Sequence, residues 1–313
     1  MTERSGILTI NRVAAGREAR HGWGEIHHAS CFTGHWLRDH RLDVTRDLAD
    51  PEVFAEVKDL LGKHHMLVFK GQEIDAEKMI AFTEHFGELD IHILRQFTHK
   101  DHATVSIISN MEDRKANVND VSLNWHTDLA YRKRPSAFVT LYADVVPEEG
   151  ADTRFAAVQR VYKDMSEQEK NHLRGRRATY SFLHLHSKRP DPDPLTPEQL
   201  AESADVHHPL LRRHPDTGEE ILYLNLPDCI GVSGLEKEEG LQTVRNLYER
   251  ITDPANTIGH KWTVGDLVIW DNRTLMHSAT YFDDKKYKRR MLRTVVRGEE
   301  PMPSTLGASA AAE

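Results

Sequence analysis

The chain has 313 residues, of which 39% are hydrophobic and 29% are charged, and its formal net charge is -8. This composition is typical of a water-soluble globular protein, and the negative charge disfavours nucleic acid as a partner because a phosphate backbone attracts cations. With no apolar run of about 18 residues and only two cysteines, Cys31 and Cys229, the sequence predicts no membrane span and no disulfide framework, and a cytoplasmic location is expected.

The first 124 residues predict helices around a short strand. Residues 50–62 have helical spacing of apolar side chains and end at a glycine, so they predict a helix. Residues 65–69 are a short apolar run that predicts a buried strand, and residues 75–86 predict a second helix. Residues 87–124 are mostly polar, apart from a predicted strand at 103–108. We expect residues 90–124 to form a lid or pocket loop.

Strands dominate the rest of the chain. They are predicted at 136–146, 180–186, 266–270 and 290–296, with a short one after the turn at 150–153 and a hairpin that joins 209–213 to 219–225. A capping-box pattern from Ser166 to Glu169 predicts the start of a helix, and residues 236–252 predict another. Residues 187–207 are predicted to form a second pocket loop, and the tail from about residue 303 is predicted to be flexible.

This pattern indicates a fold class. Short strands fill the second half, helices cluster toward the front, and no βαβ repetition or internal repeat is present. A mostly β fold with flanking helices fits this order, and we predict a double-stranded β-helix, the jelly-roll barrel. No linker requires a second domain, so residues 1–313 are interpreted as one domain.

One short segment carries the strongest chemical signal. Residues 125–128 read Trp-His-Thr-Asp, and on a strand His126 and Asp128 would point to the same face and reach one ion. His277, just after the predicted strand 266–270, is positioned to add a third ligand from an opposite strand. Two imidazoles and one carboxylate form the facial triad that holds non-heme Fe(II), although the same three ligands also suit a catalytic zinc ion.

Asp271 is a rival carboxylate close to His277. It lies in a Trp-Asp-Asn-Arg turn, where an aspartate more often caps the backbone or pairs with an arginine. We therefore interpret Asp271 as structural.

Two arginines on the strand after His277 are candidate anion anchors. Arg289 and Arg293 are four residues apart and would face the same side of a strand, whereas Arg290 would face the other side. Each guanidinium can bind a carboxylate or sulfonate through two hydrogen bonds. The alternative is that they form surface salt bridges.

The chain resembles the taurine dioxygenase and 2,4-dichlorophenoxyacetate dioxygenase family of Fe(II)- and 2-oxoglutarate-dependent oxygenases. The matching landmarks occur in order over most of the chain. They are Leu67-Val68-Phe69, Gly71-Gln72, Phe86-Gly87-Glu88-Leu89, Trp125-His126-Thr127-Asp128, Gly150-Ala151-Asp152-Thr153, Gly265-Asp266, Trp270-Asp271-Asn272-Arg273 and His277. The resemblance implies that His126, Asp128 and His277 are the catalytic iron ligands, that Thr153 donates a hydrogen bond to 2-oxoglutarate, and that Arg289 binds its distal carboxylate.

The resemblance also implies a substrate site. Arg293 would face an acidic group of the substrate, and His92 stands where taurine-specific members have a histidine that contacts the sulfonate. Arg95 stands where those members usually have a tyrosine, and Ala151 replaces a more common glycine. The difference at Arg95 argues against taurine as the substrate.

The implied activity uses Fe(II), 2-oxoglutarate and O2. Succinate and CO2 are released, and a C–H bond of a small, anionic substrate is hydroxylated, desaturated, or cleaved after hydroxylation. Relatives commonly self-associate, so a homo-oligomer is compatible with the resemblance. Two alternatives remain at this stage, a zinc-dependent hydrolase and a non-catalytic metal-binding barrel. The hydrolase gives Thr153 and Arg289 no role.

Overall fold

The computed structural model describes residues 8–10, 27–28, 42–111, 121–189 and 192–304. Cys31, the residues 112–120 of the first predicted loop, and the predicted tail beyond residue 304 lie outside these ranges.

The strands are β1 (Leu8–Ile10), β2 (His27–His28), β3 (Met66–Phe69), β4 (Ser106–Ser109), β5 (Ser136–Val145), β6 (Thr153–Ala157), β7 (Arg177–Tyr180), β8 (Val206–Pro209), β9 (Leu211–Arg213), β10 (Glu220–Leu222), β11 (Cys229–Val232), β12 (Thr257–His260), β13 (Leu267–Asp271), β14 (Leu275–Ala279) and β15 (Arg290–Arg297). The helices are α1 (Val44–Asp47), α2 (Pro51–His64), α3 (Ala76–Glu84), α4 (Val158–Asp164), α5 (Glu167–Leu173), α6 (Phe182–Ser187), α7 (Pro197–Ala201) and α8 (Lys237–Ile251), with short 3-10 turns η2 (Arg95–Phe97), η3 (Val121–Leu123) and η4 (Pro254–Asn256).

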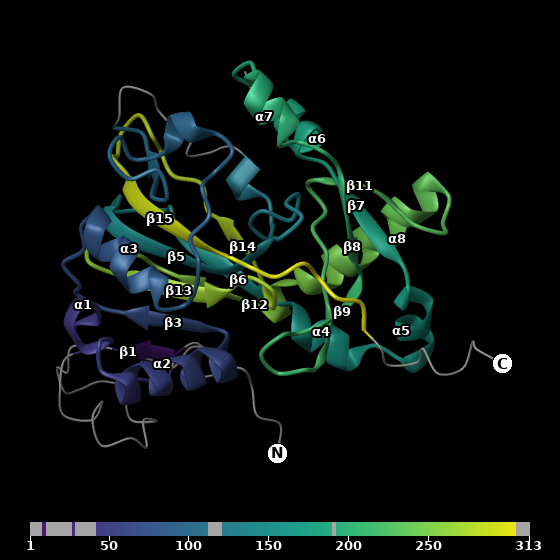
Figure 1. The fold of residues 1–313 in the computed structure, drawn as a ribbon, viewed down its shortest axis with the longest axis horizontal. Coiled ribbons are helices and arrows are strands. Elements are labelled where there is room, and N and C mark those ends of the chain that lie inside the picture. The colour runs from purple at the N-terminus through teal and green to yellow at the C-terminus, as the bar shows by residue number, and fades with distance from the viewer. Residues whose placement is uncertain (1–7, 11–26, 29–41, 112–120, 190–191, 305–313) are drawn as a thin grey trace.

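Two sheets pack against each other within the main core. A seven-stranded sheet has the order β2-β1-β3-β13-β5-β15-β4, and a three-stranded sheet has the order β12-β6-β14 (Figure 1). Side chains from both sheets interlock between them, as where the rings of Phe155 and Trp270 meet edge to face with centroids 5.4 Å apart. The predicted class, mostly β with flanking helices, is confirmed. Among the described residues the strands form separate sheets and no closed barrel.

Helices α2 and α3 cover the other face of the large sheet (Figure 1). Alternation along β15 explains how one strand serves both sides, because successive side chains point to opposite faces. Met291 and Val295 pack into the core between the sheets, and Leu292 and Val296 pack against the helix layer. The predicted strand at 290–296 and its alternation are therefore confirmed.

Local signals in the sequence set several helix starts. The Asp50 side chain accepts a hydrogen bond from the amide of Glu52 at the start of α2. The predicted end at Gly62 is wrong, because α2 continues to His64 and is followed by His65 in the left-handed conformation with φ of 61°. Ser166 and Glu169 form both hydrogen bonds of the predicted capping box at the start of α5. The hairpin β9–β10 and the helix α8 also lie where the sequence predicts them.

The strand predicted at 180–186 is wrong. Strand β7 ends at Tyr180, and α6 begins after Ser181, whose side chain accepts a hydrogen bond from the amide of His184. An alternation of apolar and histidine residues also brings positions i and i+4 together on a helix. Phe182 and His186 use that spacing, and their buried rings stack with centroids 5.5 Å apart.

Several elements had no counterpart in the sequence prediction. They are β11, β12, α1 and α4, whereas β14 supplies the strand on which His277 was expected and whose bounds were not predicted. The second predicted loop, 187–207, contains the capped helix α7, which projects beside α6 in Figure 1. No helix in the described ranges is long and apolar enough to cross a bilayer.

The helix layer allows a prediction about stability. Phe82 on α3 is 1% exposed and packs on the rings of Phe69 and Phe86. Replacing it with alanine removes these contacts and leaves a cavity, so Phe82→Ala should lower the free energy of unfolding by about 3–5 kcal/mol. Chemical denaturation measures the loss. Ile80→Ala, at a half-buried position of the same helix, should cost clearly less, and equal losses would contradict the predicted packing.

Candidate metal centre

A backbone bridge brings the two candidate histidines together. The amide of His126 donates to the carbonyl of His277 at 2.9 Å, and the amide of His277 donates to the carbonyl of His126 at 2.9 Å. Paired residues of an antiparallel bridge have side chains on the same face. The two imidazole centroids consequently lie 4.2 Å apart, although the residues are distant in the sequence.

Asp128 completes the group. Its carboxylate oxygens lie 3.7 Å from Nε2 of His126 and 4.0 Å from Nε2 of His277, and all three ligand atoms lie within 4.8 Å of one another. Two ligands that each bind an ion at about 2.1 Å are at most about 4.2 Å apart, so both His–Asp distances fit a shared ion. The expectation that His126 and Asp128 lie on a strand is wrong, because only His126 forms a bridge and Asp128 lies in a turn.

The environment favours the protonation states that a metal requires. Burial raises the pKa of the Asp128 carboxyl, but Arg293 and then His277 lower it more, to about 2. Burial, followed by the neighbouring His126, lowers the pKa of His277 to about 3. Near neutral pH the site therefore presents an ionised carboxylate and a neutral His277 imidazole, the forms that bind metal ions.

Neighbouring groups orient the rings. Nδ1 of His126 lies 2.7 Å from the carbonyl oxygen of Asn124, so this nitrogen donates to the backbone and Nε2 is left facing Asp128. The ring of Trp270 packs edge to face on His277 with centroids 4.8 Å apart. The His277 imidazole is therefore held against an aromatic ring.

Arg289 is a buried cation without a described counter-charge. It is 5% exposed, and burial alone lowers its pKa to about 10. Within the described ranges its Nε has no hydrogen-bond partner. A buried unpaired charge is costly. The local structure therefore suits an anionic ligand at this position.

Thr153 lies on β6, two residues before Phe155, which pairs with His277 of β14. Its side chain is buried, and its hydroxyl oxygen accepts a hydrogen bond from the indole of Trp262 at 3.0 Å. Because this bond uses the oxygen as an acceptor, the hydroxyl proton is still able to be donated to another group.

The three predicted substrate residues are not all in one place. Arg293 contacts both oxygens of Asp128 through Nη1, at 3.3 and 3.4 Å. Burial and then Arg293 lower the pKa of His92 to about 3, so this imidazole is neutral and close to Arg293. Arg95 instead pairs with Glu202 at 2.7 Å, is half exposed, and lines a cavity of about 690 Å³. None of its described contacts reaches Asp128 or the histidines.

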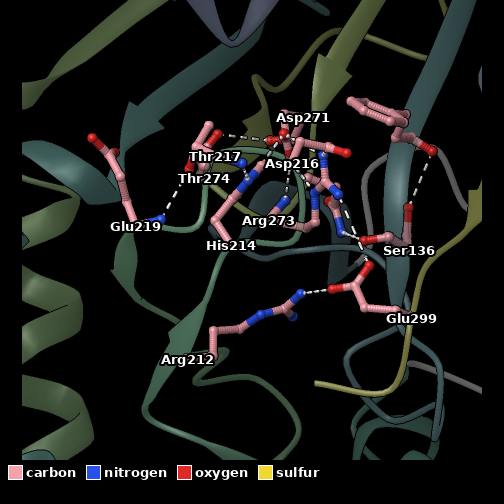
Figure 2. Close-up of polar contacts among 12 residues, drawn as sticks. Ser136, Arg212, His214, Asp216, Thr217, Glu219, Asp271, Arg273, Thr274 and Glu299 are labelled. Atoms are coloured by element: carbon pink, nitrogen blue, oxygen red, sulfur yellow. Dashed lines mark hydrogen bonds and ion pairs between the residues drawn. The ribbon is translucent and has the colours of Figure 1, made fainter. Parts of the chain in front are cut away.

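A second cluster of possible metal ligands is already occupied by an arginine. His214, Asp216 and Asp271 also have ligand atoms within 4.8 Å of one another. Figure 2 shows the Arg273 side chain among them, with hydrogen bonds of 2.6 Å to Asp216 and of 2.7 and 2.8 Å to Asp271. The guanidinium supplies the positive charge that an ion would bring. The interpretation of Asp271 as a structural residue is in keeping with these contacts, whereas the partners His214 and Asp216 carried no sequence signal.

Comparisons with known proteins place these features in a family context. Residues 32–295 match the model of the family described as taurine catabolism dioxygenase TauD, TfdA family. The chain is 30% identical to the alpha-ketoglutarate-dependent 2,4-dichlorophenoxyacetate dioxygenase of Burkholderia sp. (strain RASC), over 73% of this chain and 82% of that protein. It is 28% identical to the pentalenolactone F synthase of Streptomyces arenae, over 82% of this chain and 90% of that protein.

Solved structures are also similar to this fold. A putative alpha-ketoglutarate-dependent taurine dioxygenase from Burkholderia xenovorans superposes with a TM-score of 0.70 and 26% identity, over 84% of this chain and 89% of that chain. AAD-2, solved in complex with Mn(II) and N-oxalylglycine, superposes with a TM-score of 0.69 and 28% identity, over 83% of this chain and 92% of that chain.

The cluster in Figure 2 yields a prediction. Arg273→Ala leaves the buried carboxylate of Asp271 without its main partner, and such a loss typically costs about 3–5 kcal/mol. Equilibrium unfolding should show a decrease of this size. Arg250→Ala removes a more exposed ion pair with Glu169 and should cost about 0–1 kcal/mol. A similarly small effect of Arg273→Ala would refute the structural role of the cluster.

Proposed function

The chain belongs to the taurine catabolism dioxygenase TauD, TfdA family, and from this premise we propose that it oxidises a C–H bond of a small, anionic substrate while 2-oxoglutarate is converted to succinate and CO2. The protein is an alpha-ketoglutarate-dependent dioxygenase, an oxidoreductase that uses Fe(II), 2-oxoglutarate and O2. The observation that carries the proposal is the His126, Asp128 and His277 group together with Arg289, a buried arginine that has no anionic partner among the described residues. In this proposal the separate sheets form the two halves of a jelly roll in one domain.

The proposed roles follow from the chemistry of each side chain. His126, Asp128 and His277 would hold Fe(II) and leave positions open for other ligands. The bound iron supplies the redox chemistry with O2 and 2-oxoglutarate. Arg289 would bind the distal carboxylate of 2-oxoglutarate, because its buried charge lacks a described anion, and the Thr153 hydroxyl would donate a hydrogen bond to the same molecule.

The substrate site is proposed at His92 and Arg293. Arg293 carries a positive charge beside Asp128, and neutral His92 offers a second polar contact close to it. This arrangement suits an acid group held close to the reacting C–H bond. Among the relatives, some are named for aryloxy acids, 2,4-dichlorophenoxyacetate and (S)-phenoxypropionate. Arg95 would act from the rim of the substrate site rather than within it.

The two predicted pocket loops support this location. Gln199 donates to the carbonyl of Ile93 at 2.9 Å, and Arg95 and Arg132 both pair with Glu202. Residues 90–111 and 192–207 are thus joined by polar contacts. We propose that together they border the substrate entrance. The zinc hydrolase and the non-catalytic barrel do not account for family membership or for the charge of Arg289.

Arg289 provides a direct test of the cosubstrate site. Arg289→Ala should weaken 2-oxoglutarate binding by about 2–5 kcal/mol, because the bound carboxylate loses a buried cationic partner. Calorimetry on the metal-loaded, anaerobic protein measures this change. Arg290→Ala is the matched control, since Arg290 pairs with Asp144 and faces the other side of the strand. Equal affinity of the Arg289 variant and the native protein would refute the assignment.

The reaction class is tested by an anaerobic titration of metal-free protein with Fe(II) and 2-oxoglutarate. We expect a weak visible charge-transfer band when both are present, because 2-oxoglutarate binds iron through two oxygens. His126→Ala should abolish the band. A folded native protein that never develops it would contradict the proposed cofactor set.

A further inference from the structure

The segment that carries Asp128 is held by a buried carboxamide from the 271–274 turn. The amide of Asp128 donates to Oδ1 of Asn272 at 2.9 Å, and Nδ2 of Asn272 donates to the carbonyl of Asp128 at 3.0 Å. The same Nδ2 lies 3.3 Å from the carbonyl oxygen of Ser136 at the start of β5. Asn272 is fully buried. One side chain thus satisfies both backbone groups of the metal-site aspartate.

A second carboxamide holds the preceding residue. The amide of Thr127 donates to Oδ1 of Asn225 at 3.1 Å, and Nδ2 of Asn225 donates to Asp228 at 2.7 Å. The bond to Asp228 fixes which end of the carboxamide faces Thr127. Burial raises the pKa of Asp228 to about 8, so this anchor is neutral near pH 7 and adds no negative charge behind the metal site.

In this segment, side-chain hydrogen bonds take the place of backbone pairing between strands. His126 is bridged to His277, but Thr127 and Asp128 have no strand partner in the described structure, and Leu129 follows with φ of 58°. Buried backbone groups require partners, and a carboxamide provides one donor end and one acceptor end. Without Asn225 and Asn272, the turn would have no described hydrogen bond that fixes its amides.

We propose that Asn225 and Asn272 are positioning residues for the metal centre. They hold the backbone of residues 127 and 128 so that the Asp128 carboxylate stays within reach of both imidazoles. The inference rests on the proposed function, because it takes Asp128 as a metal ligand. Neither asparagine touches the ligand side chains in the described contacts, so both act through the backbone.

A third buried asparagine offers a matched comparison. Oδ1 of Asn110 accepts the amide of Arg289 at 2.8 Å, and its Nδ2 donates to the carbonyls of Asp284 and Tyr287. Like Asn272, it binds a backbone amide through its carboxamide oxygen, but this amide belongs to Arg289, the proposed 2-oxoglutarate anchor. Asn256 is a further control, because its half-buried carboxamide bridges the carbonyls of Ala157 and Ile251, outside the metal-site segment.

The experiment compares four alanine variants of the full chain, at positions 110, 225, 256 and 272. Titration of metal-free protein with Co(II), followed by visible absorption, measures the metal affinity and the ligand field. Asn225→Ala and Asn272→Ala should bind Co(II) about 10–100-fold more weakly, with altered absorption bands. Asn110→Ala should retain Co(II) affinity and lose 2-oxoglutarate affinity, and Asn256→Ala should retain both.

Amide hydrogen exchange on the metal-free protein tests the inference independently of the metal. The amides of Thr127 and Asp128 should exchange faster in Asn225→Ala and in Asn272→Ala respectively, and at the native rate in Asn256→Ala. If the native protein does not bind Co(II), the proposed function fails while this exchange result still decides the backbone role. Native Co(II) affinity in both folded variants, an equal loss in Asn256→Ala, or unchanged exchange would overturn the inference. Should Asn272→Ala not fold, Asn225→Ala carries the same test.

Discussion

The site depends on one pair of backbone hydrogen bonds, those between His126 and His277. They join the loop after η3 to strand β14 at a single bridge, and everything else at the centre is placed relative to it. Since an antiparallel bridge fixes which side chains face each other, the two imidazoles converge, with ring centroids 4.2 Å apart. β14 in turn pairs with β6, which carries Thr153, so the same sheet register positions a candidate metal ligand and a candidate cosubstrate contact.

Strand β15 links this centre to both large hydrophobic clusters. Its odd-numbered residues include Arg293 and the core residues Met291 and Val295, and Leu292 and Val296 on its other face anchor the helix layer. A shift of β15 by one residue would bury the wrong side chains on both faces. The side of the sheet that Arg293 faces is therefore set by the packing of its apolar neighbours on β15, whereas Arg289 precedes the strand and its amide is held by Asn110.

The features of the fold and the site that could be predicted are those that follow from residue patterns along the sequence. The start of α5 follows from a capping box that is visible in the residues. That Arg289 and Arg293 face the same side stays a prediction, because Arg289 precedes β15. Helix α6 was mistaken for a strand because Phe182 and His186 fit both periods. Asn225 and Asn272 could not be recognised, since their partners are backbone groups brought near only by the fold.

The contrast between two buried aspartates explains why one is suited to a metal and the other is not. The carboxylate of Asp271 accepts three hydrogen bonds of 2.7 to 2.9 Å from Arg273, and Nε2 of His214 lies 3.0 Å away. Its oxygens therefore already have hydrogen-bond partners. Among the described side chains, the cation near Asp128 is Arg293, at the longer distances of 3.3 and 3.4 Å, which lowers the pKa of Asp128 and leaves its oxygens able to accept another partner. Both carboxylates are ionised and almost equally buried. The proposed difference in function therefore follows from the position of the nearest arginine. Arg273 donates hydrogen bonds to both oxygens of Asp271 and forms a structural ion pair with it. Arg293 lies farther from Asp128, whose oxygens are still able to bind a metal ion.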